Sequence, residues 1–85
     1  MIKNMPDHLP PLSDTAKNLK PGLYRHFKGD NYEVLGVGRN SLDYAEELVF
    51  YRSADNGGLW ARPLFDFLAI VERDGYNGPR FIFIQ

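Results

Sequence analysis

The sequence predicts a mostly β domain, a small antiparallel barrel of SH3-like type with about five strands. Three observations lead to this prediction. Short runs of alternating apolar and polar residues are separated by clusters of glycine, asparagine and aspartate, a pattern typical of small antiparallel barrels. The only tryptophan, Trp60, lies on one of these runs and is followed by a helical turn. A strand rich in aromatic residues comes last.

The first half of the predicted barrel is a hairpin. Residues 22–28 alternate between two faces, as a strand does. Gly29, Asp30 and Asn31 predict the turn, because these residue types tolerate the backbone that hairpins need. Residues 32–39 form the second strand, in which Gly36 and Gly38 indicate a bulge or a bend. These glycines do not begin a dinucleotide fingerprint, since position 41 is serine and no helix follows.

The second half continues after a polar loop over residues 40–45. Residues 47–53 are apolar on both faces and predict a central strand, and residues 59–62 form a short fourth strand. Pro63 begins a helical turn over residues 63–69, since proline suits the first helical position. Asp74-Gly75 and Asn77-Gly78 mark turns before the last strand, residues 80–84. The apolar run that we expect to plug the barrel comprises Leu64, Phe65, Phe67, Leu68, Ile70 and Val71.

The length of 85 residues predicts one domain. Residues 1–20 are predicted to be an extended or flexible leader, because they hold three prolines and few apolar residues. An alternative is one or two helical turns over residues 13–19 with Ser13 as the N-cap, but a mobile or loosely docked tail is preferred. Residues 21–85 form the barrel. An OB-type barrel is the main rival, but it needs a longer helix between the third and fourth strands than the sequence shows.

Composition excludes several classes of function. Ten basic and eleven acidic residues give a net charge of −1, so nonspecific nucleic-acid binding is not expected. The chain has no cysteine, which excludes disulfides and cysteine-ligated zinc. No stretch approaches the roughly 18 apolar residues that span a bilayer, and the first residues lack the apolar core of a signal peptide. We therefore predict a cytoplasmic protein without membrane association.

Several strings in the sequence, taken together, resemble a known bacterial family. They are Pro21 to Gly29 (PGLYRHFKG), Tyr32 to Val37 (YEVLGV), Leu48 to Arg52 (LVFYR), Gly58 to Leu64 (GLWARPL) with Phe67, and Gly78 to Phe81 (GPRF). These strings look like those of the family catalogued as domain of unknown function 1653, over roughly residues 21–83. The resemblance implies no activity, substrate or cofactor, because the family has none assigned.

Catalytic and metal-binding motifs are weak. His26 is the only histidine inside the predicted barrel, and a metal site needs further ligands that no spacing suggests. A serine–histidine–aspartate catalytic triad could be assembled on paper from His26 and nearby serines and aspartates, but no stretch of the sequence resembles the nucleophile elbow of such enzymes. We predict no catalytic residue, no metal and no cofactor, and interpret His26 mainly as a structural or hydrogen-bonding residue.

An aromatic and arginine set carries the binding hypothesis. Trp60 and Arg62 are two residues apart on one strand and share a face. A guanidinium beside aromatic rings can stack on them, or the two together can hold a planar anionic ligand. The preferred interpretation places Trp60 in the core with Arg62 lying over it, and the alternative is an open ligand site. The candidate ligand-binding residues are Tyr24, His26, Tyr51, Arg52, Trp60 and Arg62.

The sequence therefore favours a noncatalytic binding module of bacterial type. Its predicted partner is a protein segment or a small anionic or nucleic-acid ligand. The alternative is a small enzyme or nucleotide-processing accessory that uses His26 and Arg62. His26 beside Arg62 and a carboxylate in one pocket would favour the enzyme. A third possibility is an oligomer whose open sheet edges pair.

Overall fold

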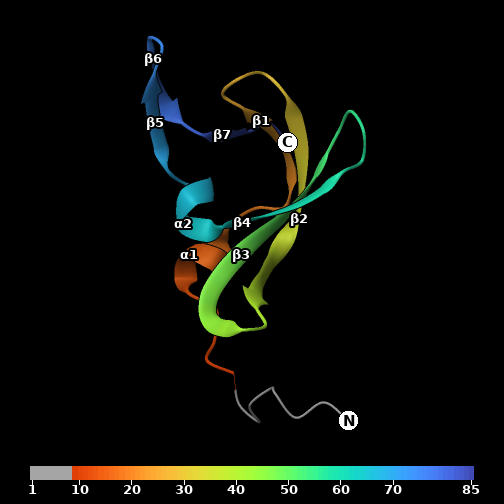
Figure 1. Ribbon diagram of the computed structural model, residues 1–85, viewed down its shortest axis with the longest axis vertical. Coiled ribbons are helices and arrows are strands. Elements are labelled where there is room, and N and C mark those ends of the chain that lie inside the picture. The colour runs from red at the N-terminus through yellow and green to blue at the C-terminus, as the bar shows by residue number, and fades with distance from the viewer. Residues whose placement is uncertain (1–8) are drawn as a thin grey trace.

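The computed structural model describes residues 9–85, and within this range the chain is mostly β, as predicted (Figure 1). Its strands form two antiparallel sheets, accompanied by two short helices. In chain order the elements are α1 (Asp14–Asn18), β1 (Gly22–His26), β2 (Asn31–Asn40), β3 (Asp43–Ser53), β4 (Leu59–Pro63), α2 (Leu64–Phe67), β5 (Ile70–Arg73), β6 (Tyr76–Pro79) and β7 (Phe81–Phe83). None of the helices described is long and apolar enough to cross a membrane.

The main sheet has the strand order β4-β3-β2-β1-β7. It is built on β2 and β3, the longest strands described, which form one continuous hairpin. The two end strands, β4 and β7, do not pair with each other, so the predicted barrel is not closed by backbone hydrogen bonds. Side chains between these strands fill the gap instead, as shown below for Arg62 and Phe81.

Two turns differ from those predicted. The polar loop expected over residues 40–45 is wrong, because β2 runs to Asn40 and β3 begins at Asp43, leaving only a tight turn between them. Asn77-Gly78 is also not a turn but lies within β6. The chain reverses once, at Asp74-Gly75, where both residues have positive φ (53° and 83°). Two successive positive φ angles are those of a type I′ hairpin turn, which joins β5 to β6 as the second sheet.

The predicted bulge in the second strand is confirmed. The register of β2 against β3 shifts between Val34 and Gly36, leaving Leu35 without a partner across the ladder. Such a bulge increases the local bend of a strand. It lets the long hairpin curve around the core.

The core lies on one face of the main sheet, called here the inner face. The sheet contributes the buried residues Tyr24, Val34, Val49, Tyr51 and Phe81, and α2 covers them with Leu64 and Phe67. Phe67 is 1 % exposed and stacks on Phe81 with ring centroids 4.1 Å apart. The ring of Tyr51 meets both of these rings edge-on. Edge-to-face and offset-stacked pairs of this kind stabilise a core beyond the area they bury.

The segment before the sheet is docked, which corrects the preferred prediction for residues 9–20. Ser13 caps α1 by accepting the backbone N–H of Ala16 at 3.1 Å, as the alternative proposed. The backbone N–H and the hydroxyl of Ser13 both bond to the carboxylate of Glu47 at 2.7 Å. Ala16 is buried in the core, and Leu12 and Leu19 pack against it. Apolar residues at positions 12, 16 and 19, on one side of α1 and its flanks, dock this helix in spite of the prolines before it. Residues 1–8 of the predicted leader lie outside the described residues.

The predicted plug is only partly buried. Leu64, Phe67 and Val71 point into the core. Phe65, Leu68 and Ile70 are 78 %, 43 % and 65 % exposed, because α2 is a single turn that buries one side and β5 belongs to the separate two-stranded sheet.

Candidate functional site

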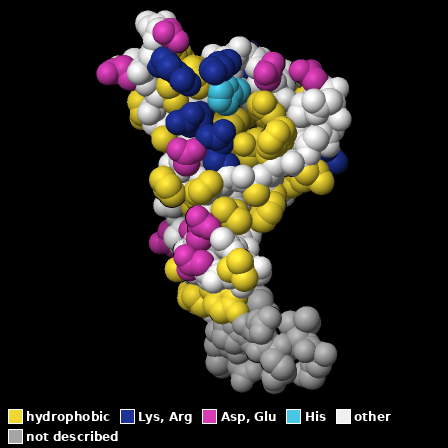
Figure 2. Space-filling view, in the orientation of Figure 1, with side chains coloured by type: hydrophobic (Ala, Val, Ile, Leu, Met, Phe, Trp, Pro, Cys, Tyr) yellow, Lys and Arg dark blue, Asp and Glu magenta, His cyan; other side chains and the backbone are white. Residues whose placement is uncertain are grey.

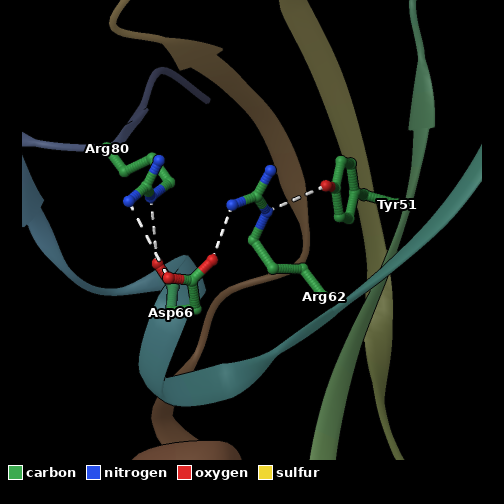
Figure 3. A network of polar contacts seen from close by, with 4 residues as sticks. All are labelled: Tyr51, Arg62, Asp66 and Arg80. Atoms are coloured by element: carbon green, nitrogen blue, oxygen red, sulfur yellow. Dashed lines mark hydrogen bonds and ion pairs between the residues drawn. The ribbon is translucent and has the colours of Figure 1, made fainter.

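Arg62 lies at the centre of a polar network on the inner face (Figure 3). Its Nε donates to the hydroxyl of Tyr51 at 3.2 Å, and its NH1 donates to Oδ2 of Asp66 at 2.6 Å. Local sequence creates this geometry. Pro63 ends β4 and leads into α2, and one helical turn brings Asp66, four residues after Arg62, back beside it.

Asp66 is shared between two arginines. Besides Arg62, the carboxylate lies 3.8 Å from NH2 of Arg80, and Nε of Arg80 donates to the backbone carbonyl of Asp66 at 3.2 Å. Arg80 directly precedes β7, whereas Arg62 is on β4, so the network bridges the two unpaired ends of the main sheet (Figure 3). The guanidinium of Arg62 also lies 5.7 Å from the ring centroid of Phe81 on β7. These side chains thus fill the gap between β4 and β7, the two strands that do not pair through their backbones.

The ionisation of Arg62 is fixed by these contacts. Burial acts to lower the pKa of its guanidinium, but the hydrogen bonds to Tyr51 and Asp66, together with the charges of these two groups, outweigh burial and raise the pKa. Arg62 therefore carries a full positive charge at any physiological pH.

His26 lies next to this network, at the end of β1. Its Nδ1 accepts the backbone N–H of Lys28 at 3.1 Å, so in the neutral ring the proton is on Nε2. The imidazole packs edge-on against Phe81 at 5.0 Å and against Tyr32 at 6.4 Å. Burial lowers the pKa of His26, and the positive charges of Arg62, Arg80 and Lys28 lower it further, against a smaller opposing effect of Asp30.

Positive charges gather at this surface around His26. Two arginines share one carboxylate, and Lys28 adds a third cation. Figure 2 shows the same gathering, with dark blue basic side chains around the single cyan histidine and apolar side chains beside them. Each guanidinium has five N–H donors and uses only part of them within residues 9–85. We call His26, Lys28, Tyr51, Trp60, Arg62 and Arg80 the basic–aromatic site.

Trp60 lies at the rim of this site. It is opposite Tyr51 in the β3–β4 register and therefore on the same face of the sheet. Its side chain is 56 % exposed, so the interpretation of Trp60 as a core residue is wrong. Trp60 is on an edge strand and is largely exposed to solvent. Arg62, by contrast, is more firmly held than the sequence suggested.

Two of the six predicted residues lie elsewhere. Tyr24 is 5 % exposed, donates its hydroxyl to the carbonyl of Lys20 at 2.7 Å and belongs to the core. Arg52 is on the opposite face, where it bonds Glu33 directly across the ladder at 2.6 Å. Strand alternation explains Arg52, because Tyr51 and Arg52 are adjacent and must point to opposite faces. The structure brings together His26, Tyr51 and Arg62, and places Trp60 on the same face, opposite Tyr51.

Sequence reasoning missed Lys28, Asp66 and Arg80. The i,i+4 spacing of Arg62 and Asp66 was a usable signal. Lys28 lies in the turn after β1, two residues beyond His26, and no strand pattern placed it. No local pattern indicated Arg80, since its place depends on β7 pairing with β1 far away in the chain.

Two open cavities lie outside the basic–aromatic site. One, of about 460 Å³, is lined by apolar residues of α2 and by the carboxylates of Asp43, Glu46 and Glu47, whose charge opposes an anion. The other, of about 540 Å³, is on the opposite face beside the paired Glu33 and Arg52. In residues 9–85 no three histidine or carboxylate side chains come together as metal ligands would. Neither cavity includes a residue of the basic–aromatic site.

Comparison with known proteins identifies the family. The family described as "Protein of unknown function (DUF1653)" matches residues 22–83. The chain belongs to the DUF1653 family. A crystal structure of a DUF1653 protein from Bordetella bronchiseptica is similar, with 29 % sequence identity and a TM-score of 0.74, over 81 % of this chain and 91 % of that one. No curated protein matches the chain. The resemblance predicted from the sequence is confirmed, and the basic–aromatic site lies within the DUF1653 match.

Proposed function

We propose that this DUF1653 protein is a noncatalytic binding module whose basic–aromatic site holds an anionic group joined to a planar ring. The observation that supports this proposal most is the crowding of Arg62, Arg80 and Lys28 around His26 with one carboxylate between the two arginines. A phosphate or carboxylate placed there would relieve the repulsion among the cations and accept their remaining N–H groups. The exposed indole of Trp60 offers a surface on which the ring can stack.

The geometry favours binding over the alternative of a small enzyme. His26, Arg62 and a carboxylate are neighbours, but Asp66 is occupied by two arginines. Nδ1 of His26 accepts a backbone N–H, and its lowered pKa makes it a weaker base than an ordinary imidazole. A general base needs an accessible acceptor and a pKa near the working pH. The side chains of Arg62, Asp66 and Arg80 are partly exposed to water, whereas reactive chemistry commonly requires that water be excluded.

The predicted setting is the bacterial cytoplasm, and the ligand can be a free small molecule or a group on a protein segment. Isothermal titration calorimetry with a nucleoside monophosphate tests the proposal, because this probe carries both a phosphate and a planar ring. Titrations with inorganic phosphate alone and with the neutral nucleoside alone separate the contribution of the phosphate from that of the ring. Each should bind more weakly than the nucleoside monophosphate.

Two exposed side chains give variants that leave the core intact. Lys28→Gln and Trp60→Ala should each weaken binding several-fold. Arg52→Gln removes a positive charge from the opposite face and serves as the matched control. The proposal fails if Arg52→Gln weakens binding as much as Lys28→Gln, or if the nucleoside monophosphate does not bind at all.

A further inference from the structure

The β5–β6 hairpin is docked against the basic–aromatic site through one aromatic ring. The ring of Phe27, directly after β1, contacts His26 with ring centroids 4.6 Å apart. The backbone N–H of Phe27 donates to the carbonyl of Arg80 at 2.9 Å. Tyr76 of β6 stacks on the Phe27 ring with centroids 5.3 Å apart, and Figure 1 shows the hairpin standing beside the turn that follows β1. Whatever lies on this face of the hairpin is therefore a neighbour of the site.

The docked face of the hairpin carries Arg73. Arg73 is opposite Tyr76 in the register of β5 against β6, and residues that oppose each other across a ladder point to the same face. The guanidinium of Arg73 lies 5.4 Å from the ring centroid of Phe27, and Nζ of Lys28 lies 6.0 Å from the same centroid. Strand alternation directs the neighbouring Glu72 to the other face of the hairpin. One ring thus brings two cations together.

These two cations have no acidic partner in the part of the chain that the structure describes. Within residues 9–85, neither Lys28 nor Arg73 lies within ion-pair distance of a carboxylate, and both residues are exposed. Arg62 and Arg80, by contrast, share the carboxylate of Asp66. The arginine pair is therefore partly neutralised, whereas the pair beside the hairpin keeps its full charge.

Lys28 connects the two pairs of cations. Together with the two arginines of the site it lowers the pKa of His26, and together with Arg73 it borders the ring of Phe27. In Figure 2 the dark blue side chains accordingly continue past the cyan histidine toward the end of the molecule where β5 and β6 lie. The cations form one continuous surface with room for more than one anionic group.

We propose that the ligand of the basic–aromatic site carries two linked phosphates, as a nucleoside diphosphate does. This inference rests on the function proposed above and names its ligand class. The phosphate nearer the ring lies against Arg62 and Arg80. The terminal phosphate lies between Lys28 and Arg73, where an ammonium and a guanidinium together offer several N–H donors to its oxygens. Because these two cations lack a carboxylate partner, the second phosphate should raise the affinity.

Calorimetry on the full chain, without divalent cations, compares a nucleoside monophosphate with the corresponding diphosphate. An added charge about 6 Å from one cation on an exposed surface changes affinity by about three- to tenfold, so we expect the diphosphate to bind about tenfold more tightly. Inorganic pyrophosphate should likewise bind more tightly than inorganic phosphate, which tests the second phosphate position without the ring.

Variants at Arg73 assign the preference to the hairpin. Arg73→Gln should lower the affinity for the diphosphate about threefold or more and change that for the monophosphate by less than about twofold. Arg73→Lys keeps the positive charge and should retain most of the preference. Arg52→Gln, which removes a charge from the opposite face, is the matched control and should leave the preference unchanged.

The outcomes separate this inference from the function on which it rests. A diphosphate that binds no more tightly than the monophosphate would overturn the inference and leave the proposed function standing. Equal losses of affinity for the two nucleotides in Arg73→Gln would also overturn it, because Arg73 would then act only through the fold or at the first phosphate. Failure of both nucleotides to bind would overturn both proposals.

Discussion

Replacing Asp66 by asparagine should move stability and ligand affinity in opposite directions. Asp66 holds Arg62 through a 2.6 Å ion pair and lies 3.8 Å from Arg80. Charge-assisted hydrogen bonds contribute about 1.5–3 kcal/mol when well shielded, but these side chains are partly exposed, so we expect Asp66→Asn to lower the free energy of unfolding by about 1–2 kcal/mol. The amide keeps the shape and one acceptor oxygen, and the network should loosen without collapsing.

The same change removes the only carboxylate of the network. The negative charge of that carboxylate repels an anionic ligand, so its loss should raise the affinity for the ligand. At a separation of about 7 Å and an effective dielectric constant of about 40–80, one charge contributes about 0.6–1.2 kcal/mol, or roughly a three- to sevenfold gain in affinity for a nucleoside monophosphate. Urea denaturation measures the first effect and calorimetry the second. Glu33→Gln removes a carboxylate from the opposite face and should change neither by a measurable amount. Loss of affinity in Asp66→Asn would refute the reasoning.

Three further predictions concern the fold around the site. Trp60→Ala should change the free energy of unfolding by less than about 1 kcal/mol, because the indole is 56 % exposed; a loss of several kcal/mol in a thermal melt would show that it is packed. Ala16→Asp should destabilise the chain by about 2–4 kcal/mol in urea, because it places a charge in the contact between α1 and the core; wild-type stability would show that α1 is not docked. Hydrogen bonds from Ser13 lower the pKa of Glu47 below its ordinary value of 4.5, so the stability that Glu47 contributes is present above that value and is lost as the pH falls through the folded pKa. Wild type should accordingly lose more stability than Glu47→Gln between neutral and acid pH, and parallel pH profiles of the two would contradict this.

The strands of the main sheet could be predicted because each is a local pattern. Alternation and turn residues located the β1–β2 hairpin and β4, and the paired glycines of β2 indicated its bulge. The docking of α1 could not be predicted in this way. It depends on Glu47, more than thirty residues from Ser13 in the chain, and on a core that exists only after the sheet has formed.

The candidate site could likewise be predicted only where it depends on local pattern. Trp60 and Arg62 share a face by simple alternation, and the structure agrees. The burial of Trp60 was misjudged, because burial depends on which strands are at the edges of the sheet, and the sequence does not show strand order. Arg80 reaches the site only through the pairing of β7 with β1, a long-range contact without a local signature.

The titration of His26 tests most directly whether this surface is built to receive an anion. Its imidazole resonances, assigned with the variant His26→Gln, can be followed by NMR against pH with and without a nucleoside monophosphate. In the free protein we expect a pKa below the ordinary value of 6.5, set by burial and the three nearby cations. A bound anion stabilises the imidazolium, so the ligand should raise the pKa of His26. A pKa at or above 6.5 in the free protein, or one that the ligand leaves unchanged at saturation, would contradict the account.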